Sequence, residues 1–384
     1  MKKIFVIVSV KNESDIIESF CRYNLTFCDG MLIYENHKSS DDTREIISKL
    51  IDEGLPLYFE DEEDMYYEDA KGILLQRAIN KYGADLVIPL DADEFIYHTK
   101  GTDPRQTLES LHEDVEYHAI WRTYLYEREP DIKLGFMPNN FTHYRNPIME
   151  DPNVYERHKK VIVSRFLVEK MEASLVVGTH FLLYPDPRKD DVKTELCNEL
   201  VFAHFPIRSK AQVMKKSIPN WINKWAQKER TTREALDAFQ LGVLFNEIKE
   251  HGDISQEKMV QYSLEYAMLL DVSNADDLSK SGRDKLNALI KGLGDRIKIN
   301  DPLDTTYCQD KLKLYYTDYS NDTKTLIKAV LSQVDTTITY LAMESDERRK
   351  YHIEFVDNIY NSKTWKIGSK IQRIFGFLVR NKRN

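Results

Sequence analysis

The sequence predicts an α/β fold in which a sheet with buried parallel strands is covered by helices on both faces. Two observations lead to this prediction. Short apolar, often β-branched runs alternate with amphipathic segments through the first hundred residues, and each run is continuously apolar rather than alternating in polarity. Continuous apolar strands are typical of parallel sheets buried on both faces. The chain has 384 residues, 42% hydrophobic and 30% charged, which is enough to bury a sizeable core.

Strands and helices are expected to alternate in residues 1–100. The expected strands are the apolar runs 3–10, 31–34, 55–59 and 86–90. The first helix is expected after Ser14, which can cap it, and the second after Asp41 and Asp42. The third is expected over 70–82, with Ile73, Leu74, Arg77 and Ala78 inward or at its border.

The rest of the chain changes from strand-rich to helical. Further strands are expected at 119–126, 161–168, 175–184 and 200–205, with long loops over 130–152. Helical periodicity follows over 209–267, 323–342 and 348–360. The predicted organisation is a domain over 1–208 with halves 1–100 and 101–208, a mainly helical C-terminal region over 209–361, and a tail over 362–384.

Charge and cysteine content exclude several classes of protein. The net charge is −9, from 54 basic and 63 acidic residues, which argues against a general nucleic-acid binder. The four cysteines form no Cys-x-x-Cys pair, which excludes a zinc ribbon and favours the reducing cytosol.

No apolar run approaches the roughly 18 residues of a membrane span. The run 4–8 has no cleavage site after it, so it is interpreted as a strand rather than a signal peptide.

Asp91-Ala92-Asp93 is the sharpest chemical feature, since it directly follows the fourth predicted strand. Ligands of parallel sheets bind outside the carboxyl ends of the strands. Paired carboxylates there are hard oxygen ligands, suited to Mg²⁺ or Mn²⁺ bridging a substrate diphosphate. The alternative is that Asp-x-Asp occurs by chance or caps a helix. A phosphatase of the haloacid dehalogenase type, which has this pair after its first strand, is disfavoured by the position here.

Four segments in order resemble the glycosyltransferase family 2 superfamily. They are Val10-Lys11-Asn12-Glu13, the segment 34–43, the segment 76–80 and Leu90-Asp91-Ala92-Asp93-Glu94-Phe95. The Asp-Ala-Asp-Glu-Phe form is typical of a branch with paired downstream histidines, similar to His180 and His204. The resemblance covers roughly residues 1–220, and segment 362–368 resembles an ending of bacterial polysaccharide glycosyltransferases. The resemblance of residues 1–220 implies a GT-A fold, which is a Rossmann-like mixed sheet flanked by helices. The helical C-terminal region would follow this fold.

The resemblance also implies roles for individual residues. Asn12 and Glu13 would line the nucleotide pocket, and Glu35 would contact the base or ribose of the donor. Asp91 would lie near the ribose and the metal, Asp93 would coordinate Mn²⁺ or Mg²⁺ directly, and His204 would be a later ligand or contact the diphosphate. A neutral imidazole completes a mixed N/O site for Mn²⁺. At position 35 the family's usual Asp is replaced by Glu, one methylene longer.

The catalytic base is left open by the sequence. An inverting transferase needs a carboxylate or imidazole within reach of the acceptor hydroxyl. The candidates are Glu94, Asp151, Glu172, His158 and His180. For His180 and His204 the alternative is a hydrogen-bonded histidine of the core.

Two charged segments suggest partners. The tail 362–384 has basic but no acidic residues, with interspersed aromatic and aliphatic ones, as in an amphipathic helix on an anionic membrane. A solvated terminus or a homo-oligomer contact is the alternative. The acidic run 60–64 is interpreted as a solvated loop, with a lid over the donor or acceptor as the alternative.

The resulting hypothesis is a metal-dependent, inverting glycosyltransferase that uses a nucleotide-sugar donor and a glycan or lipid-linked acceptor in surface polysaccharide synthesis. It is expected to be cytoplasmic, with peripheral contact to the inner face of the membrane. The competing hypotheses are a non-catalytic nucleotide- or glycan-binding protein and another Asp-x-Asp phosphate enzyme.

Overall fold

A computed structural model describes the part of the chain that carries the predicted sheet. The described residues are 1–35, 39–60, 70–98, 103–131, 135–145, 159–176, 179–185, 188–217, 244, 247–248, 251, 253–266, 297–298 and 313. All of them belong to the first of two compact units, Met1–Gln333 and Val334–Asn384. The helices expected at 323–342 and 348–360, and the tail 362–384, lie outside the described residues.

The four strands predicted in the first hundred residues form one parallel block. They are β1 (Ile4–Val10), β2 (Gly30–Glu35), β3 (Leu57–Phe59) and β4 (Leu86–Leu90). Their order in the sheet is β3-β2-β1-β4, and every neighbouring pair is parallel. The carboxyl ends of β1 and β4 therefore meet at one edge, as the sequence predicted.

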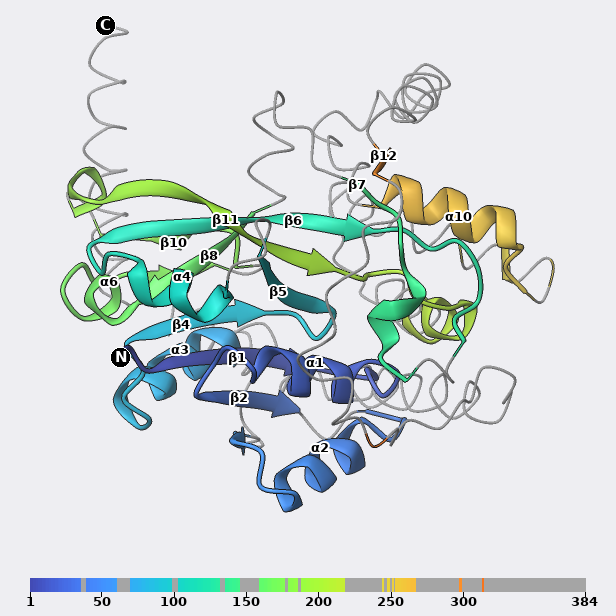
Figure 1. Ribbon diagram of the computed structural model, residues 1–384, viewed down its shortest axis with the longest axis horizontal. Helices are drawn as coiled ribbons and strands as arrows, with labels where there is room; N and C mark the ends of the chain where they lie inside the picture. The colour runs from blue at the N-terminus through green and yellow to red at the C-terminus, as the bar shows by residue number, and fades with distance from the viewer. Residues whose placement is uncertain are drawn as a thin grey trace, which may run out of the picture. The chain divides into compact units, whose positions relative to one another are not determined.

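The sheet continues beyond β4 with antiparallel pairs. β8 (Lys159–Ser164) pairs with β4, and β6 (Val115–Tyr124) pairs with β8. β7 (Tyr144–Arg145) follows on β6, and β12 (Ile297–Lys298) follows on β7. β11 (Lys193–His204) lies parallel to β6 and antiparallel to β5 (Glu94–His98). Figure 1 shows the arrowheads of β2, β6 and β11 pointing to the same side. The predicted mixed sheet flanked by helices is confirmed.

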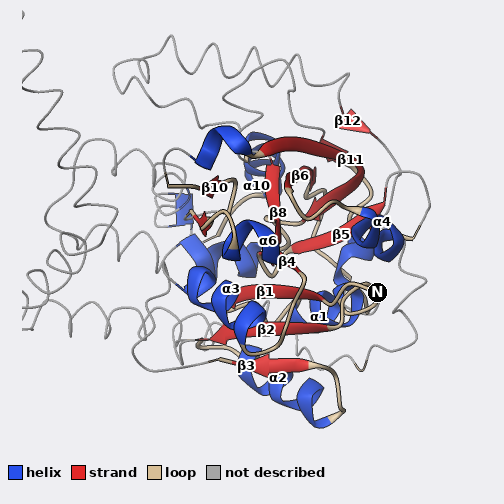
Figure 2. Ribbon diagram, turned by 90° about the vertical axis from the view of Figure 1, so that its left-hand side faces the viewer, coloured by secondary structure: helices blue, strands red, loops and turns tan. Residues whose placement is uncertain are grey.

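Helices cover both faces of this sheet, as the continuously apolar strands require. α1 (Ile17–Asn24), α2 (Thr43–Asp52) and α4 (Pro104–Ser110) lie on one side, and α3 (Ala70–Asn80) and α6 (Arg165–Glu169) on the other. Figure 2 shows α1 and α4 separated from α3 and α6 by the strands. Ile4, Val6 and Val8 of β1 pack on the α1 side, while Phe5 and Ile7 pack on the α3 side. The two-residue period of the strand thus supplies both halves of the core.

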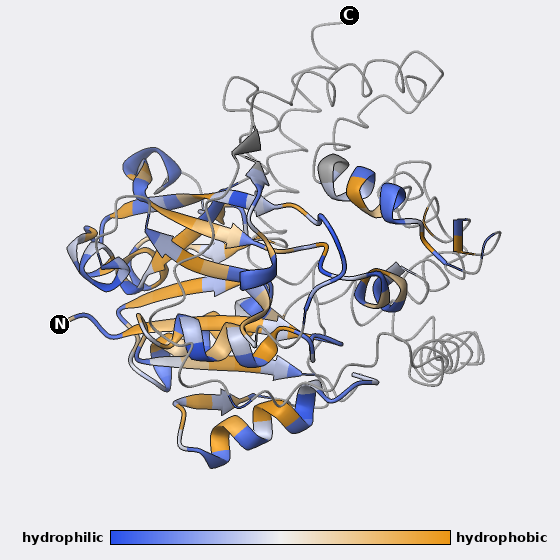
Figure 3. Cartoon of the chain, turned by 45° about the vertical axis from the view of Figure 1, so that its right-hand side comes forward, coloured by the Kyte–Doolittle hydropathy of each residue, from blue (hydrophilic) through white to orange (hydrophobic). Residues whose placement is uncertain are grey.

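A smaller apolar cluster joins the sheet to part of the helical region expected after residue 209. α10 (Gln256–Glu265) packs there with residues that follow β6 and β11, and Tyr126 N donates to Ser263 Oγ at 2.7 Å. Its buried members are Tyr126, Ile207, Val213, Leu244, Ile254 and Met259. Figure 3 shows the strands as mainly apolar and α10 as mixed. Within the described residues, no helix is both long and apolar enough to cross a bilayer.

Several element predictions need correction. The expected strand 161–168 ends at Ser164, whose side chain accepts from Leu167 N and caps α6. The expected strand 175–184 is a hairpin of β9 (Ser174–Leu175) and β10 (Leu182–Leu183). β5 and α4 were not predicted, and two short 3₁₀ helices, Met137–Asn140 and Arg188–Asp191, lie in expected loop or turn regions.

Two local predictions about helix residues also need correction. Ser14 does not cap α1, because its hydroxyl donates to Asp41 Oδ2 at 2.7 Å and the helix begins at Ile17. Ile73 does not face the core, because 36% of it is exposed while its neighbours Leu74 and Leu75 are buried.

Candidate active site

Three chain segments meet where β1, β4 and β11 end. Strand β5 starts directly after Asp93, and its first residue, Glu94, pairs with His204 at the end of β11. Arg208, four residues further on, forms ion pairs with Glu13 after β1 and with Asp93 after β4. The parallel block and the β5–β11 pair thus bring together residues that are almost 200 positions apart in sequence.

Asp93 and His204 face each other at the centre of this edge. His204 Nε2 lies 3.6 Å from Asp93 Oδ1, which is longer than a hydrogen bond. The other ring nitrogen, Nδ1, is buried without a hydrogen-bond partner among the described residues. The ring stacks on Trp121 with centroids 4.5 Å apart. Burial lowers the pKa of His204 to about 4, despite the nearby Asp93, so its imidazole is neutral at physiological pH.

Arg208 is the fully buried cation of the site. It donates from Nε and Nη2 to the two oxygens of Asp15 at 2.7 and 2.9 Å, and from Nη2 to Glu13 as well. Its pKa is raised, because Asp15 and Glu13 outweigh the opposing effect of burial. For Glu13, burial raises the pKa to about 7 although Arg208 opposes the shift. One fully buried guanidinium therefore balances the charges of several carboxylates, which are themselves only slightly exposed.

Asp91 faces two ammonium groups. Lys71 Nζ lies 2.5 Å from its Oδ1 and Lys160 Nζ lies 2.8 Å from its Oδ2, while 44% of the Asp91 side chain is exposed. The partial burial of Asp91 opposes its ionisation. Lys160 and Lys71 outweigh this effect and hold the pKa of Asp91 well below its usual range. Asp91 is thus an ionised carboxylate whose two oxygens already have cationic partners.

Glu94 is fully buried, which corrects its candidacy as the catalytic base. Its Oε2 accepts from Asp91 N at 2.9 Å, and its Oε1 lies 3.3 Å from Lys160 Nζ. Burial raises the pKa of Glu94 to about 8, against the opposing charge of Lys160. Its side chain has 0% exposure and braces the turn between β4 and β5 through Asp91 N, which disfavours direct contact with an acceptor hydroxyl.

The residues expected to bind the nucleotide hold the connection between β2 and α2. Asn12 has a left-handed φ of 57°, and its Oδ1 accepts from Ser40 N at 2.7 Å. Glu35 is buried, accepts from Ser39 N at 3.0 Å, and pairs with Arg44 at 2.9 Å. The structure thus places Glu35 in an internal ion pair, and its contact with a donor base stays a prediction.

The remaining base candidates fall in different places. His180 is half-buried, with Nδ1 2.8 Å from the carbonyl of Lys159 and its ring edge on Trp121 at 5.3 Å. Glu172 is exposed in a left-handed turn between α6 and β9. Asp151 and His158 lie outside the described residues. His180 shares a contact, through Trp121, with the site around His204.

Replacing His180 by Asn is expected to make the protein less sensitive to acid. Burial, followed by Lys160, lowers the pKa of His180 from 6.5 to about 4. Between these values the unfolded chain binds a proton that the folded chain does not, so stability falls as the pH falls from about 6.5 to about 4. Asn keeps an N–H for the Lys159 carbonyl but does not titrate. In urea unfolding, the loss of stability from pH 7 to pH 5 should be smaller in the variant by about 2 kcal/mol. Equal losses would contradict this prediction.

Several residues of the site were missed by sequence reasoning. Lys71, Lys160, Trp121 and Arg208 received no role. Tyr266, at the end of α10, has its ring centroid 5.6 Å from that of His204. The one available signal was Lys160 itself, a charged residue at the start of an apolar run that forms a fully buried strand. The other contacts arise from elements that are distant in sequence.

A divalent cation fits one part of the predicted ligand set. Among the described residues, no group of three or more His, Cys, Asp or Glu side chains could hold a metal ion. Asp93 Oδ1 and the neutral His204 Nε2 nevertheless converge at 3.6 Å without a hydrogen bond. Two ligands that each lie about 2.1 Å from one cation are separated by about 3.0–3.6 Å. Asp93 and His204 thus fit as two ligands, whereas the oxygens of Asp91 face lysines.

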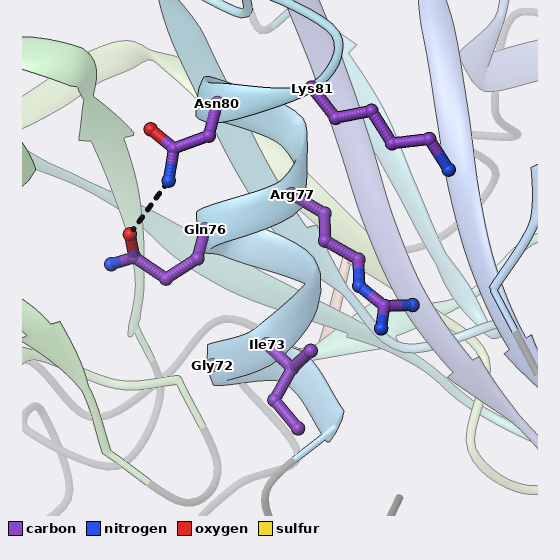
Figure 4. Close-up of a pocket in the computed structure, with 6 residues that line it drawn as sticks. All are labelled: Gly72, Ile73, Gln76, Arg77, Asn80 and Lys81. Carbon is purple, nitrogen blue, oxygen red and sulfur yellow. Dashed lines mark hydrogen bonds between the residues drawn. The ribbon is translucent and has the colours of Figure 1, made fainter. Parts of the chain in front are cut away.

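A depression on the outer face of α3 is a separate feature. It has a volume of about 460 Å³ and is lined by Gly72, Ile73, Gln76, Arg77, Asn80 and Lys81 (Figure 4). Asn80 Nδ2 donates to Gln76 Oε1 at 3.4 Å, and Arg77 and Lys81 bind Glu60. None of the predicted site residues lines it, so it is distinct from the edge at Asp93.

Glu60 corrects part of the interpretation of the acidic run. It is buried and accepts from Arg77 and Lys81 at 2.7 Å each and from Tyr82 at 2.5 Å. These donors outweigh burial and lower the pKa of Glu60. Glu60 is therefore a buried residue that anchors the end of β3, and it is not part of a solvated loop. Residues 61–69 lie outside the described part of the chain.

Comparison with known proteins shows similarity only among solved structures. No family model and no curated protein matches the chain. The structure of S. aureus TarS residues 1–349 is similar with a TM-score of 0.36 and 12% identity, over 74% of this chain and 92% of that one. The TarS complex with UDP-GlcNAc has a TM-score of 0.34 and 12% identity, over 70% and 81%.

Another similar structure is glucosyl-3-phosphoglycerate synthase from Mycobacterium tuberculosis with Mn²⁺, UDP and glucosyl-3-phosphoglycerate. Its TM-score is 0.30 and its identity is 13%, over 66% of this chain and 81% of that one. At this level of similarity, the fold assignment depends on the strand order and register of the chain itself. Any inference about function depends on the residues of the site.

Proposed function

We propose that the chain is a metal-dependent, inverting glycosyltransferase that moves a sugar from a nucleotide-diphosphate donor to a glycan or lipid-linked acceptor in surface polysaccharide synthesis. The observation that carries the proposal is the pair formed by Asp93 and neutral His204 at the edge where β1 and β4 end. Ligands of such sheets bind at this edge. A carboxylate and an unprotonated imidazole are a ligand combination that Mn²⁺ accepts.

The resident side chains support this chemistry in distinct ways. A divalent cation held by Asp93 and His204 would neutralise the charge that develops on a leaving diphosphate. Lys71 and Lys160 keep Asp91 ionised beside this position, where it can accept a hydrogen bond from a donor hydroxyl. Asn12 and Glu13 belong to the same edge, where the nucleotide is expected. Stacking on Trp121 fixes the plane of the His204 ring.

The proposal is tested by thermal shift with a panel of nucleotide sugars, each with and without Mn²⁺. A bound ligand raises the apparent stability by mass action, by about 2.7 kcal/mol at one hundred times its Kd. UDP-GlcNAc, the ligand of one TarS structure above, belongs in the panel. The expected result is stabilisation by one donor class that is larger with Mn²⁺ than the separate effects of donor and metal. Additive or absent shifts across the panel would refute a metal-bridged diphosphate.

Contact with a membrane is a second part of the proposal and depends on sequence alone. The tail 362–384 is basic and interspersed with aromatic and aliphatic residues, and each Lys or Arg near an anionic surface adds about 1 kcal/mol. Peripheral attachment at the inner face of the membrane would place the enzyme beside a lipid-linked acceptor. Flotation with anionic liposomes should fall when residues 362–384 are removed, and unchanged flotation would contradict this part.

A further inference from the structure

Arg208 holds both the side chain and the main chain of Asp93, the first directly and the second through Phe205. Nη1 of Arg208 lies 3.5 Å from Asp93 Oδ2 and donates to the carbonyl of Phe205 at 3.1 Å. The N–H of the same Phe205 donates to the carbonyl of Asp93 at 2.9 Å. Arg208, Phe205 and Asp93 thus form a closed ring of contacts, and Asp93 cannot turn without breaking part of it.

The other side of the guanidinium is anchored just after β1. Asp15 accepts two hydrogen bonds from Arg208, at 2.7 and 2.9 Å, and Glu13 accepts another. A bidentate pair with a carboxylate fixes the plane of a guanidinium as well as its position. Since Arg208 is fully buried, this geometry is not loosened by bulk water. The direction of Nη1 toward Asp93 is therefore set from the β1 side.

This arrangement distinguishes the two oxygens of Asp93. Oδ2 faces Arg208 at 3.5 Å, and Oδ1 faces His204 Nε2 at 3.6 Å. A cation between Asp93 and His204 would meet only Oδ1, so Asp93 would be a monodentate ligand. Groups that hydrogen-bond or pair with a ligating carboxylate orient it, and losing them typically costs about 10–100-fold in metal affinity.

We propose that Arg208 is a positioning residue that presents Oδ1 of Asp93 to a divalent cation and thereby sets the affinity for that cation. The inference rests on the proposed function, because it assumes the cation at Asp93 and His204. It goes further in assigning metal affinity to a residue that would not itself be a ligand of the cation.

The test is Arg208→Lys, with Mn²⁺ binding measured by calorimetry on the full chain. Lysine keeps the positive charge, but a single ammonium cannot pair with Asp15 and Asp93 in the same fixed geometry. The Kd for Mn²⁺ should rise about 10–100-fold. The affinity for UDP measured without metal should change far less, by no more than the loss of the Arg208 contact to Glu13 produces. Transfer at saturating Mn²⁺ should recover to within a few-fold of the unsubstituted protein.

Arg165→Lys is the matched control. Arg165 also pairs with an aspartate, Asp85, at 3.1 Å, and also donates to carbonyls, those of Gly83 and Ala84. It lies beside the opposite end of β4 from Asp93, because Asp85 precedes that strand. Its replacement should leave the Kd for Mn²⁺ unchanged.

A second variant keeps the inference testable if Arg208→Lys fails to fold. Asp15→Asn removes one charge from the anchor after β1. The guanidinium then either loosens or moves closer to Asp93 and competes with the cation. Both effects weaken Mn²⁺ binding, by an expected several-fold.

The outcomes separate this inference from the proposed function. A foldable variant with unaltered Mn²⁺ affinity would refute the role of Arg208 while leaving the cation site intact. Equal losses of Mn²⁺ and nucleotide affinity would also refute it, because they would indicate general damage. If the unsubstituted chain itself binds no Mn²⁺, the proposed metal-dependent function fails and the role of Arg208 fails with it.

Discussion

Replacing Asp93 by Asn is expected to reduce sugar transfer by about 10³-fold or more while the chain still folds. The amide has nearly the same shape as the carboxylate but carries no charge to hold a divalent cation. Folding should survive for a specific reason. Arg208 keeps Asp15 and Glu13 as partners, and the Asp93 carbonyl still accepts from Phe205 N. The measurement is initial transfer rate with the donor found by thermal shift, alongside circular dichroism.

Asp85→Asn is the matched control for Asp93→Asn. Asp85 directly precedes β4, whereas Asp93 lies just beyond its other end, and Asp85 also pairs with an arginine, Arg165 at 3.1 Å. It is 36% exposed and lies away from the candidate site. The control variant should transfer sugar at the rate of the unsubstituted chain. If Asp93→Asn retained that rate, the proposed role of Asp93 would be wrong and the function would need another centre.

Replacing Lys160 by Met is expected to destabilise the fold by about 1–3 kcal/mol. Lys160 is almost fully buried, and its ammonium lies 2.8 Å from Asp91 and 3.3 Å from Glu94. Asp91 and Glu94 raise the pKa of Lys160 despite its burial, so it is charged in the fold. Met fills a similar volume, but it takes one of two cationic partners from Asp91 and leaves Oε1 of Glu94, whose pKa is raised to about 8, without the ammonium beside it. Urea unfolding at pH 7 measures the change in the free energy of unfolding.

A second substitution identifies the source of this loss. Glu94→Gln in the Lys160→Met background removes the uncompensated buried carboxyl, while Asp91 keeps Lys71 as a partner. The double variant should therefore recover part of the lost stability. Lys81→Met serves as the control at the surface, because Lys81 also pairs with a buried glutamate but is itself 60% exposed. A stable Lys160→Met variant, or no recovery in the double variant, would show that the buried ion pairs are not what stabilises this turn.

The lysines change the interpretation of the Asp-x-Asp motif. The pair of aspartates suggested oxygen ligands for a divalent cation, with Asp93 as the direct ligand and Asp91 near the ribose and the metal. In the fold, Asp91 lies between Lys71 and Lys160, whereas Asp93 lies between His204 and Arg208. The same residue type thus has two environments. A neutral imidazole leaves room for a cation, while two ammonium groups already provide the positive charge.

The sequence by itself determined the parallel block and the edge at which its chemistry lies. Continuous apolar runs separated by amphipathic helices specify β1, β2, β3 and β4, because strands buried on both faces admit few polar residues. The resemblance to the glycosyltransferase family 2 superfamily then suggested Asp93 and His204 as candidate ligands. The parallel block follows from local periodicity, and the resemblance follows from short segments at the strand ends.

Only the tertiary structure decided which side chains surround these candidates. Lys160 reaches Asp91 because β8 lies antiparallel beside β4, and Arg208 reaches Asp93 because β11 pairs with β5. Glu94 and Glu35 were candidates for contact with substrates, and the structure shows both fully buried against cationic partners. Burial and ion pairing between distant segments depend on strand order and register, and no local pattern encodes them. For this reason the sequence predicts where the candidate site lies, while the charges that surround its residues follow from the fold.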